Sequence, residues 1–331
     1  MTGKRSKVLV AGLVALSAVL AIGGAAQADP SGTPTYRDIA GTGSDTTQGV
    51  MNGLADAITV NGTKVLGSYD AVGSTNITTK DPASNPNCTI ARPASSGAGV
   101  TALVASQTAG NNCLQFARSS ANNSASFPGA NLTYVPFAVD AVTYAVRSDS
   151  SVSKKLTTAQ LKSIYNCTAP GAGTTYKPVL PQFGSGTRAF FLQSLGLTNA
   201  ADYTTTFPCV KDKDANNNPI EENTGTYLTD PANIAPYSIA QFQSQIYGVV
   251  PDVHGKAMLA TFNGVSPTDL NTDSTFKRDV YNVVPNAAIT TAPYNTIFSG
   301  NTSAICSNTG VITKYGFGIN PNCGDTSIHT P

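Results

Sequence analysis

Charged side chains are scarce in this chain of 331 residues. Lysine, arginine, aspartate and glutamate make up only 12% of it, about half the share of an average globular protein. Twenty basic residues nearly cancel nineteen acidic ones, and no basic run follows the first few residues. We therefore expect no nucleic-acid partner. The polar surface must consist of threonine, serine, asparagine and glutamine, which suits a protein that works outside the cell.

Histidine is rare as well, and several chemical motifs are missing. The chain has two histidines, His254 and His329, and no C-x-x-C pair, so we expect no metal site. It has no G-x-x-x-x-G-K-[ST] loop for nucleotide hydrolysis. A serine hydrolase would need a G-x-S-x-G elbow and a histidine base, and Gly184-Ser185-Gly186 does not match that elbow. These absences predict a protein that is not an enzyme and has no cofactor, with a secreted serine hydrolase as an alternative.

The first 28 residues have the pattern of a secretory signal peptide. Lys4, Arg5 and Lys7 precede the apolar stretch VLVAGLVALSAVLAI, and AQA ends at Ala28 as a small-residue cleavage site. Removing three of the 20 basic side chains leaves 17 against 19 acidic ones, a net charge of −2. We expect residues 29–33 to form a disordered mature N-terminus.

The six cysteines support export and indicate three disulfides. Because the first cysteine is Cys88, we expect no lipid anchor at the mature N-terminus, and no later segment is apolar and long enough to span a bilayer. We therefore expect a secreted protein, either extracellular or associated with the cell wall. Six cysteines allow fifteen pairings; the simplest hypothesis pairs neighbours, as Cys88–Cys113, Cys167–Cys209 and Cys306–Cys323.

Three stretches share one local pattern, in which strand-like residues lead through a turn of glycine, serine or threonine into an amphipathic helix. They are GTGSDTTQG (41–49), PASSGAGV (93–100) and FGSGTRAFF (183–191). Strands that alternate with helices predict an α/β fold with largely parallel sheets. In such folds ligands gather at the carboxyl ends of strands, where the helices begin.

Other segments carry secondary-structure signals of their own. Asp45-x-x-Gln48 and Thr157-x-x-Gln160 both have the form of a capping box at a helix start. The remaining patterns predict one or two buried strands over 132–147, a helix over 156–165, a surface loop over 210–233 and a late strand over 278–285.

The helix start at residues 185–188 is suited to an anion. A helix N-terminus presents unpaired backbone N–H groups and a partial positive charge, and glycine lets the backbone approach a ligand closely. Arg188 in the first turn opposes the helix dipole unless an anion is bound there. The alternative is a tight turn without a ligand, because this composition is common in turns.

Six motifs occur in the order seen in the phosphate-binding proteins of ABC transporters, which belong to the type II periplasmic binding-protein superfamily. They are GTGSDTTQGV, RPASSGAGV, FARSS, YVPFAVDAVTYAV, LTTAQLKSIY and PQFGSGTRAFF, and the resemblance covers about residues 38–290. It implies two α/β lobes, each a mostly parallel sheet flanked by helices, joined by two crossing strands. By analogy, lobe 1 comprises 34–139 plus 280–331 and lobe 2 comprises 140–279. Each neighbour-paired disulfide would then stay inside one lobe.

Carried over residue by residue, the resemblance implies a phosphate site at the helix starts. Family members commonly have an aspartate where this chain has Ser120, and that aspartate accepts the proton of hydrogen phosphate and excludes sulfate. We hypothesise that Asp45 takes this role; its alternative role is the N-cap of the first helix. The implied site comprises Ser44, Asp45, Thr46, Ser95, Ser96, Gly97, Arg118, Ser119, Ser120, Ser185, Gly186, Thr187 and Arg188.

The resemblance implies a monomer that captures inorganic phosphate in the cleft between its lobes, for uptake through an ABC transporter permease. Two alternatives stay open at this point. The ligand could be another tetrahedral oxyanion such as sulfate, or the chain could be a surface interaction module whose cleft no longer binds a ligand.

Overall fold

The computed structural model describes residues 29–30, 32–267 and 276–331. The predicted signal peptide, residues 1–28, lies outside the described residues. Asp29 belongs to the segment expected to be disordered, yet its Oδ1 forms an ion pair with Arg92 NH1 at 2.9 Å. The beginning of the described chain therefore contacts the fold.

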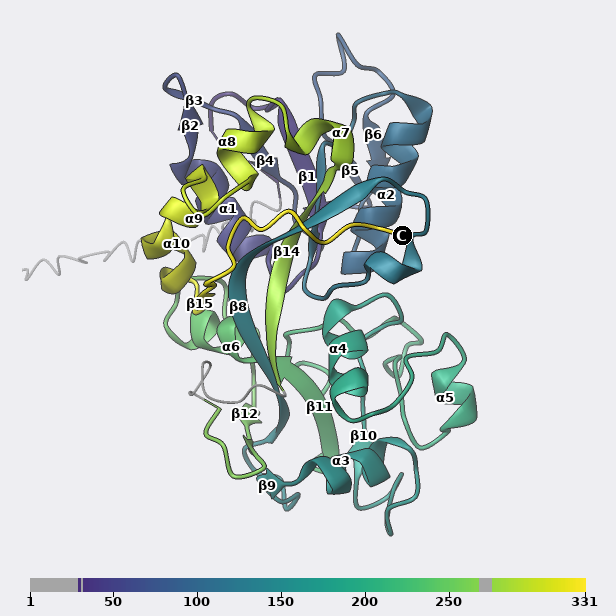
Figure 1. The fold of residues 1–331 in the computed structure, drawn as a ribbon. Coiled ribbons are helices and arrows are strands. Elements are labelled where there is room, and N and C mark those ends of the chain that lie inside the picture. The colour runs from purple at the N-terminus through teal and green to yellow at the C-terminus, as the bar shows by residue number, and fades with distance from the viewer. Residues whose placement is uncertain (1–28, 31, 268–275) are drawn as a thin grey trace, which may run out of the picture.

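Most of the strands are short, and two are long enough to cross the molecule (Figure 1). The long ones are β8 (Leu132–Arg147) and β14 (Lys277–Pro285). The others are β1 (Ile39–Gly43), β2 (Thr59–Val60), β3 (Thr63–Lys64), β4 (Leu66–Ser68), β5 (Asn76–Thr78), β6 (Thr89–Ala91), β7 (Phe116–Ser119), β9 (Lys155–Leu156), β10 (Lys177–Pro178), β11 (Asn233–Ser238), β12 (Ala257–Leu259), β13 (Thr261–Phe262) and β15 (Gly318–Ile319).

The helices are short, the longest being α2 with four turns, and they flank the main sheet (Figure 1). They are α1 (Gln48–Ala57), α2 (Ser96–Ala109), α3 (Thr158–Tyr165), α4 (Gly186–Ser194), α5 (Tyr203–Thr206), α6 (Ile239–Ile246), α7 (Asn286–Ile289), α8 (Tyr294–Phe298), α9 (Ala304–Ser307) and α10 (Thr309–Lys314), with a 3₁₀ turn at Ser124–Ser126.

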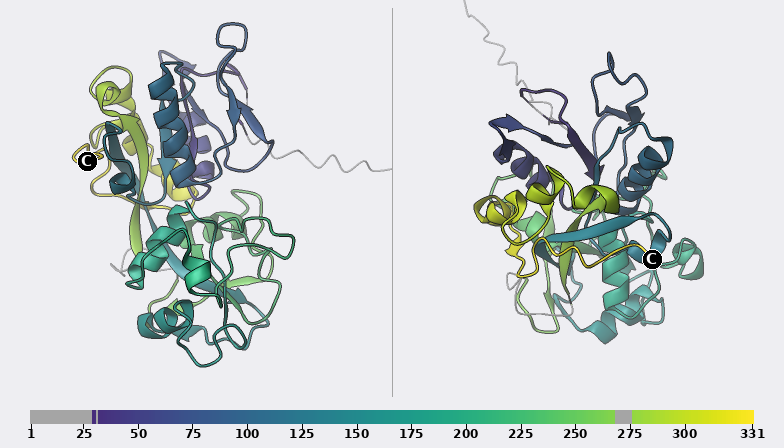
Figure 2. Two further views of the ribbon diagram at one scale, coloured as in Figure 1. Left: turned by 90° about the vertical axis from the view of Figure 1, so that its right-hand side faces the viewer. Right: turned by 45° about the horizontal axis from the view of Figure 1, so that its top comes forward.

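Two halves of the molecule are joined by the long antiparallel strands β8 and β14 (Figure 1, Figure 2). One half holds β1, β4, β7, α1 and α2, and the other holds β10, β11, α3 and α4. The pairing of β8 with β14 runs from Leu132↔Pro285 to Ala141↔Lys277. The lobe boundaries expected at 139/140 and 279/280 therefore fall inside these two strands.

The main sheet is mixed, because the crossing strands β8 and β14 add antiparallel pairs to the parallel pairs that the sequence predicted. Its nine strands include the order β10-β11-β8-β14-β7-β1-β4, with β12 and β15 also paired to β8. β1 pairs parallel with β4 and β7, and β10 pairs parallel with β11, but every partner of β8 is antiparallel to it. The local strand–turn–helix pattern could not reveal this, because the neighbours of β8 in the sheet, β11 and β14, lie far from it in the sequence.

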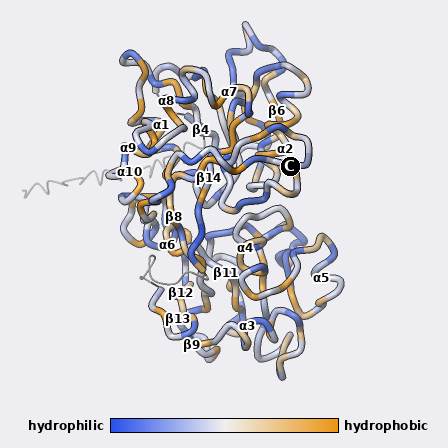
Figure 3. The backbone as a smooth tube through the Cα atoms, viewed as in Figure 1, coloured by the Kyte–Doolittle hydropathy of each residue, from blue (hydrophilic) through white to orange (hydrophobic). Residues whose placement is uncertain are grey.

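Each half has its own apolar core, and hydrophobic residues occur along the elements of both halves (Figure 3). The β8 sequence LTYVPFAVDAVTYAVR is buried over all but its last residue, as expected for a strand covered on both faces. The α6 helix is an exception to this separation: Ala240 packs in the core of the first half, and Ser244 Oγ donates to Tyr315 O at 2.7 Å. α6 thus ties the two halves together beside the crossing strands.

The helix starts confirm one of the two predicted capping boxes and correct the other. Thr157 and Gln160 form the predicted capping box of α3. Ser95 caps α2, whose end at Gly110 has φ +61°. The capping box expected at Asp45 is wrong: α1 begins at Gln48 after Thr47, and no side chain caps it. Because Gln48 instead accepts the N–H of Ala71 at 2.9 Å, it is not available to complete a box.

The three disulfides join the neighbouring cysteines, as the simplest pairing predicts. They are Cys88–Cys113, Cys167–Cys209 and Cys306–Cys323, with Cα–Cα distances of 5.0, 5.8 and 5.8 Å. No free cysteine occurs in the described part of the chain. Each bridge lies within one half, so none of them restricts movement of one half against the other.

Candidate functional site

The three glycine- and serine-rich turns meet between the two halves. The N–H of Gly97, in the first turn of α2, donates to Gly184 O at 3.2 Å. Thr46, which follows β1, lies with its Oγ1 3.2 Å from the Oγ1 of Thr187 in α4. The φ of Gly184 is +98°, a conformation that favours glycine. Turns separated by about fifty to ninety residues in the sequence thus form one site.

The start of α4 lies directly against the start of α2 and the end of β7. A Cβ added at Gly186 would lie 2.4 Å from Ser120 Oγ and 2.7 Å from Ser96 Oγ. These two hydroxyls are 3.3 Å apart, and Ser96 Oγ accepts the N–H of Ser120 at 3.1 Å. Only glycine leaves room for this approach, so position 186 sets how closely the halves can come together.

The hydroxyls of Ser95 and Ser185 are used as helix caps. Ser95 Oγ accepts the N–H of Ala98, and Ser185 Oγ accepts the N–H of Arg188 at 3.1 Å. Ser119, by contrast, bonds to its own loop: its Oγ donates to Ala121 O at 2.7 Å. The Ser119 hydroxyl is therefore directed to its own loop, while Ser95 and Ser185 cap the helices at the converging turns.

A carboxylate occupies the N-terminus of α4. Ser185 Oγ donates to Glu222 Oε2 at 2.7 Å, and the backbone N–H of Thr187 donates to the same oxygen at 3.2 Å. Glu222 is only 6% exposed. The donors that the sequence assigned to an oxyanion are thus engaged with a negatively charged side chain of the protein.

Two amide side chains connect the halves around Thr46. Asn223 Nδ2 donates to Thr46 Oγ1 at 3.0 Å and to Asp45 Oδ2 at 3.2 Å. Gln241 Nε2, from α6, donates to Thr46 O. Since Asp45 and Thr46 belong to the first half and the amides to the second, these bonds stabilise the closed arrangement.

Arg118 does not point into the meeting place of the turns. Its NH1 donates to Ser68 Oγ at 2.9 Å and to Tyr69 O at 2.8 Å, and its Nε donates to Ser44 O at 3.3 Å. The side chain is fully buried, and this burial lowers the pKa of Arg118 to about 10. Arg118 therefore holds the loop that carries Ser44 against the end of β4.

Arg188 is likewise engaged away from the α4 N-terminus. Its NH1 lies 2.8 Å from Asp212 Oδ2 and 3.1 Å from Pro181 O, and its Nε donates to Asn199 Oδ1 at 3.0 Å. Sequence reasoning took an arginine in the first turn as a sign of a bound anion. In the structure Asp212 supplies a negative partner for it instead.

The guanidinium that does reach the site comes from a crossing strand. Arg278 in β14 donates from NH2 to Thr187 Oγ1 at 2.9 Å and pairs with Asp140 Oδ2 of β8 at 2.8 Å. Asp140 Oδ1 in turn accepts the N–H of Ala240 at 3.1 Å. Arg278 NH1 is buried and has no hydrogen-bond partner among the described residues.

Other buried polar atoms around the turns also lack partners among the described residues. They are the hydroxyls of Ser44 and Thr47 and the second carboxylate oxygen of Glu222. Buried polar atoms normally have a hydrogen-bond partner. A group of them at one place is therefore consistent with a site that binds a polar ligand.

Asp45 has an unusual electrostatic position. Burial of its carboxyl group and the nearby Glu222 raise the pKa of Asp45 well above its usual value, although the hydrogen bond from Asn223 acts in the opposite direction. Two neighbouring carboxyl groups disfavour the charged form of each other. Asp45 thus tends to keep a proton, which distinguishes it from an ordinary helix cap.

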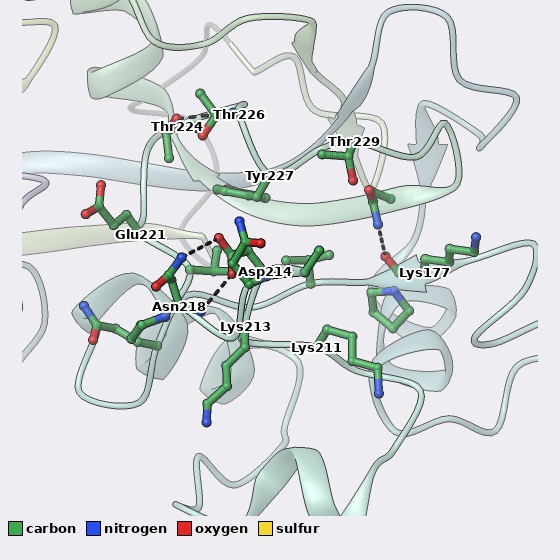
Figure 4. A pocket seen from close by; sticks show the side chains of 18 of the residues that line it. Lys177, Lys211, Lys213, Asp214, Asn218, Glu221, Thr224, Thr226, Tyr227 and Thr229 are labelled. Atoms are coloured by element: carbon green, nitrogen blue, oxygen red, sulfur yellow. Dashed lines mark hydrogen bonds between the residues drawn. The ribbon is translucent and has the colours of Figure 1, made fainter.

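Two adjoining hollows open beside these residues. A small pocket is lined by Asp45, Val72, Ala94, Gln182, Ser185, Glu221 and Glu222. A larger cavity of about 1000 Å³ shares Ala94, Gln182 and Glu221 with it and extends along β10 (Figure 4). Lys177, Lys211, Lys213, Asp214 and Tyr227 are among its lining residues (Figure 4). The small pocket at the meeting place of the turns therefore adjoins the larger cavity.

Sequence reasoning missed Glu222, Asn223, Gln241 and Arg278. The first two lie in the segment 210–233, whose composition predicted only a surface loop. Arg278 could have been noticed, because a charged residue that begins an apolar strand requires a partner when buried. Gln241 carries no local signal, since glutamine is common on exposed helix faces.

Some kinds of site are absent from the described part of the chain. No group of three or more histidine, cysteine, aspartate and glutamate side chains in it could hold a metal ion. None of its helices combines the length and the apolar character that a bilayer crossing requires.

Comparison with known proteins places the chain in a family. Residues 28–297 match the model of the PBP superfamily domain, while no curated protein matches the sequence. Solved structures share the fold. A putative phosphate ABC transporter substrate-binding protein with bound phosphate from Clostridium perfringens is 17% identical, with a TM-score of 0.56 over 85% of this chain and 99% of that one.

Two further structures agree with this result. An ABC-type phosphate transport receptor from Vibrio cholerae is 17% identical, with a TM-score of 0.50 over 85% of this chain and 100% of that one. A phosphate-binding protein from Stenotrophomonas maltophilia is 13% identical, with a TM-score of 0.51 over 87% and 92%. At these identities the likeness establishes the fold alone. The chain therefore belongs to the PBP superfamily and has the mixed α/β fold of type II periplasmic binding proteins, as its sequence motifs predicted.

Proposed function

We propose that this chain is a secreted solute-binding protein that captures inorganic phosphate between its two halves, without chemistry, for uptake through an ABC transporter permease. The observation that supports it most is the convergence of the starts of α2 and α4 with the loop after β1, through the pairs Gly97–Gly184 and Thr46–Thr187. Backbone N–H groups at a helix start suit an anion.

The groups proposed to bind the oxyanion come from both halves. Ser44, Thr46, Ser96 and Ser120 would contribute hydroxyls or N–H groups from the first half. Ser185, Gly186, Thr187 and Arg278 would do so from the second half and the crossing strand. Arg118 and Arg188 would act indirectly, because their guanidinium groups position Ser44 and the residues that precede and follow α4.

The alternative of a serine hydrolase has little support. Ser185 Oγ donates a hydrogen bond to Glu222. His254 contacts Asp252, and His329 contacts Thr133. A histidine base for Ser185 would have to come from one of these two residues, the only histidines in the chain. The likeness to proteins that bind phosphate concerns binding proteins and not enzymes.

A ligand screen tests the proposed function. Thermal unfolding of the mature chain is measured with phosphate, arsenate, sulfate and molybdate, and phosphate is expected to stabilise it. A ligand that binds only the folded state adds about 2.7 kcal/mol to the free energy of unfolding when its concentration is one hundred times the dissociation constant. Potassium chloride at equal ionic strength serves as the control. If none of the four oxyanions changes the unfolding temperature, the interaction-module alternative is preferred.

Asp45 is expected to give a pH-dependent choice between phosphate and sulfate. Below its raised pKa, Asp45 carries a proton and can donate it to either anion. Above that pKa, its carboxylate repels sulfate but can still accept the proton of hydrogen phosphate. The ratio of phosphate to sulfate affinity should therefore rise as the pH rises through the pKa of Asp45.

Titration calorimetry with both anions at several pH values measures this ratio. In the Asp45→Asn variant the ratio should vary less with pH than in the wild-type protein. A wild-type ratio that matches the variant's at every pH would remove Asp45 from the selectivity mechanism.

A further inference from the structure

Glu222 makes a contact that an anion-binding site does not need. Its Oε2 accepts hydrogen bonds from the N-cap hydroxyl of Ser185 at 2.7 Å and from the N–H of Thr187 at 3.2 Å. α4 has nine residues, and a carboxylate at its start is stabilised by the helix dipole. The side chain is 6% exposed, and its Oε1 has no partner among the described residues.

This contact lies within one half of the molecule. Glu222 and Ser185 both belong to the segment between β10 and β11, and the N–H of Gln182 donates to Ile220 O at 2.9 Å, which holds the two stretches side by side. Closure of the halves is therefore not required to bring Glu222 onto α4. The carboxylate would remain there when the halves separate.

The surroundings carry little unbalanced positive charge that could offset a second anion at the same place. Asp45 and Glu221 line the small pocket together with Glu222 and Ser185. The guanidinium groups of Arg118 and Arg188 bond to other partners, and the charge of Arg278, which reaches Thr187, is paired with Asp140. Like charges in a desolvated site repel each other strongly, so an oxyanion at the start of α4 and the Glu222 carboxylate exclude one another.

We propose that Glu222 is a built-in competitor for the oxyanion, which occupies the Ser185 hydroxyl and the Thr187 N–H until a ligand displaces it. This inference rests on the proposed function, since it concerns regulation of the same site. Its consequence is that the carboxylate weakens the affinity of the protein for oxyanions. A chain without it would bind the same anion more tightly, because the donors would be free in the unliganded state.

The test compares three proteins by titration calorimetry with inorganic phosphate: the wild type, Glu222→Gln and Glu221→Gln. Glu222→Gln keeps the size of the side chain and is expected to bind phosphate about ten-fold to one-hundred-fold more tightly than the wild type. Glu221 is exposed, and among the described residues no hydrogen bond joins its side chain to α4, so Glu221→Gln is expected to change the affinity less than about three-fold.

The outcomes separate this inference from the proposed function. If the wild type binds phosphate and Glu222→Gln binds it no more tightly, the competitor role is overturned while phosphate binding stands; weaker binding by Glu222→Gln would make Glu222 part of the ligand site. If folded samples of all three proteins bind no phosphate, the proposed function fails. Binding by Glu222→Gln alone supports both.

A measurement on the wild type avoids any folding defect of a variant. The sequence contains two glutamates, Glu221 and Glu222, so protein labelled with ¹³C at the glutamate carboxyl carbon gives two side-chain resonances. Glu221→Gln assigns them. Phosphate is expected to shift the Glu222 resonance more than the Glu221 resonance. Phosphate that binds by calorimetry and leaves the Glu222 resonance in place would contradict displacement.

Discussion

Replacing Asp140 by asparagine is expected to lower the free energy of unfolding by about 3–5 kcal/mol, because it leaves the buried guanidinium of Arg278 without its negative partner. The side chains of Asp140 and Arg278 are 0% and 2% exposed, with 2.8 Å between Oδ2 and NH2. Asp140 also accepts the N–H of Ala240. Urea unfolding followed by circular dichroism measures the change.

Two controls make this result specific to the buried pair. Asp149→Asn breaks an ion pair with Arg147 in which the aspartate is 46% exposed, and it should lower the free energy of unfolding far less than Asp140→Asn does, because water screens exposed charges. The double variant Asp140→Asn with Arg278→Met should recover much of the lost stability, since no charge is then left unpaired. Equal losses in Asp140→Asn and Asp149→Asn would mean that the pair between β8 and β14 does not support the fold.

The second large effect is expected on ligand binding from Gly186→Ala. The added methyl group would lie 2.4 Å from Ser120 Oγ and 2.7 Å from Ser96 Oγ, so it should hold the start of α4 away from the first half. Overpacking of this kind costs about 1–3 kcal/mol, which corresponds to about a five-fold to one-hundred-and-fifty-fold loss of phosphate affinity. Calorimetry measures the affinity, and small-angle scattering with phosphate measures closure.

Gly310→Ala is the matched control for this substitution. Gly310 lies in α10, where an added Cβ would meet nothing within 4 Å, so the phosphate affinity should not change. Alanine is also favoured over glycine within helices, and the fold of both variants should persist. If Gly186→Ala binds phosphate as tightly as the wild type and closes as far, the oxyanion is held without the contact of α4 with Ser96 and Ser120.

The structure gives Arg188, in the third of the glycine- and serine-rich turns, a different partner from the one that the sequence suggested. From the sequence, Arg188 beside a helix start suggested a bound anion, because a positive charge there is unfavourable without one. Asp212 provides that negative charge from 24 residues away. A local motif predicts the need for a partner, but not which partner meets it when several lie at similar distances along the chain.

The local features of this protein follow from its sequence alone. The capping box of Thr157 and Gln160 depends on residues within a few positions of one another, and so does the buried strand character of 132–147, which the sequence left open as one strand or two. The neighbour-paired disulfides close short loops, and the order of the motifs indicated the superfamily. Short-range hydrogen bonds and apolar periodicity depend on residues that are close together in the sequence, so these predictions needed no knowledge of the tertiary fold.

The composition of the site was decided by the tertiary structure. Asp140 and Arg278 are 138 positions apart, and they meet only because β8 and β14 cross side by side. Glu222 and Asn223 come from a segment whose polar composition is that of a surface loop, and Gly186 matters because α4 faces α2. Such contacts depend on how distant strands and helices pack, and a sequence pattern limited to one element carries no information about the element that will lie opposite.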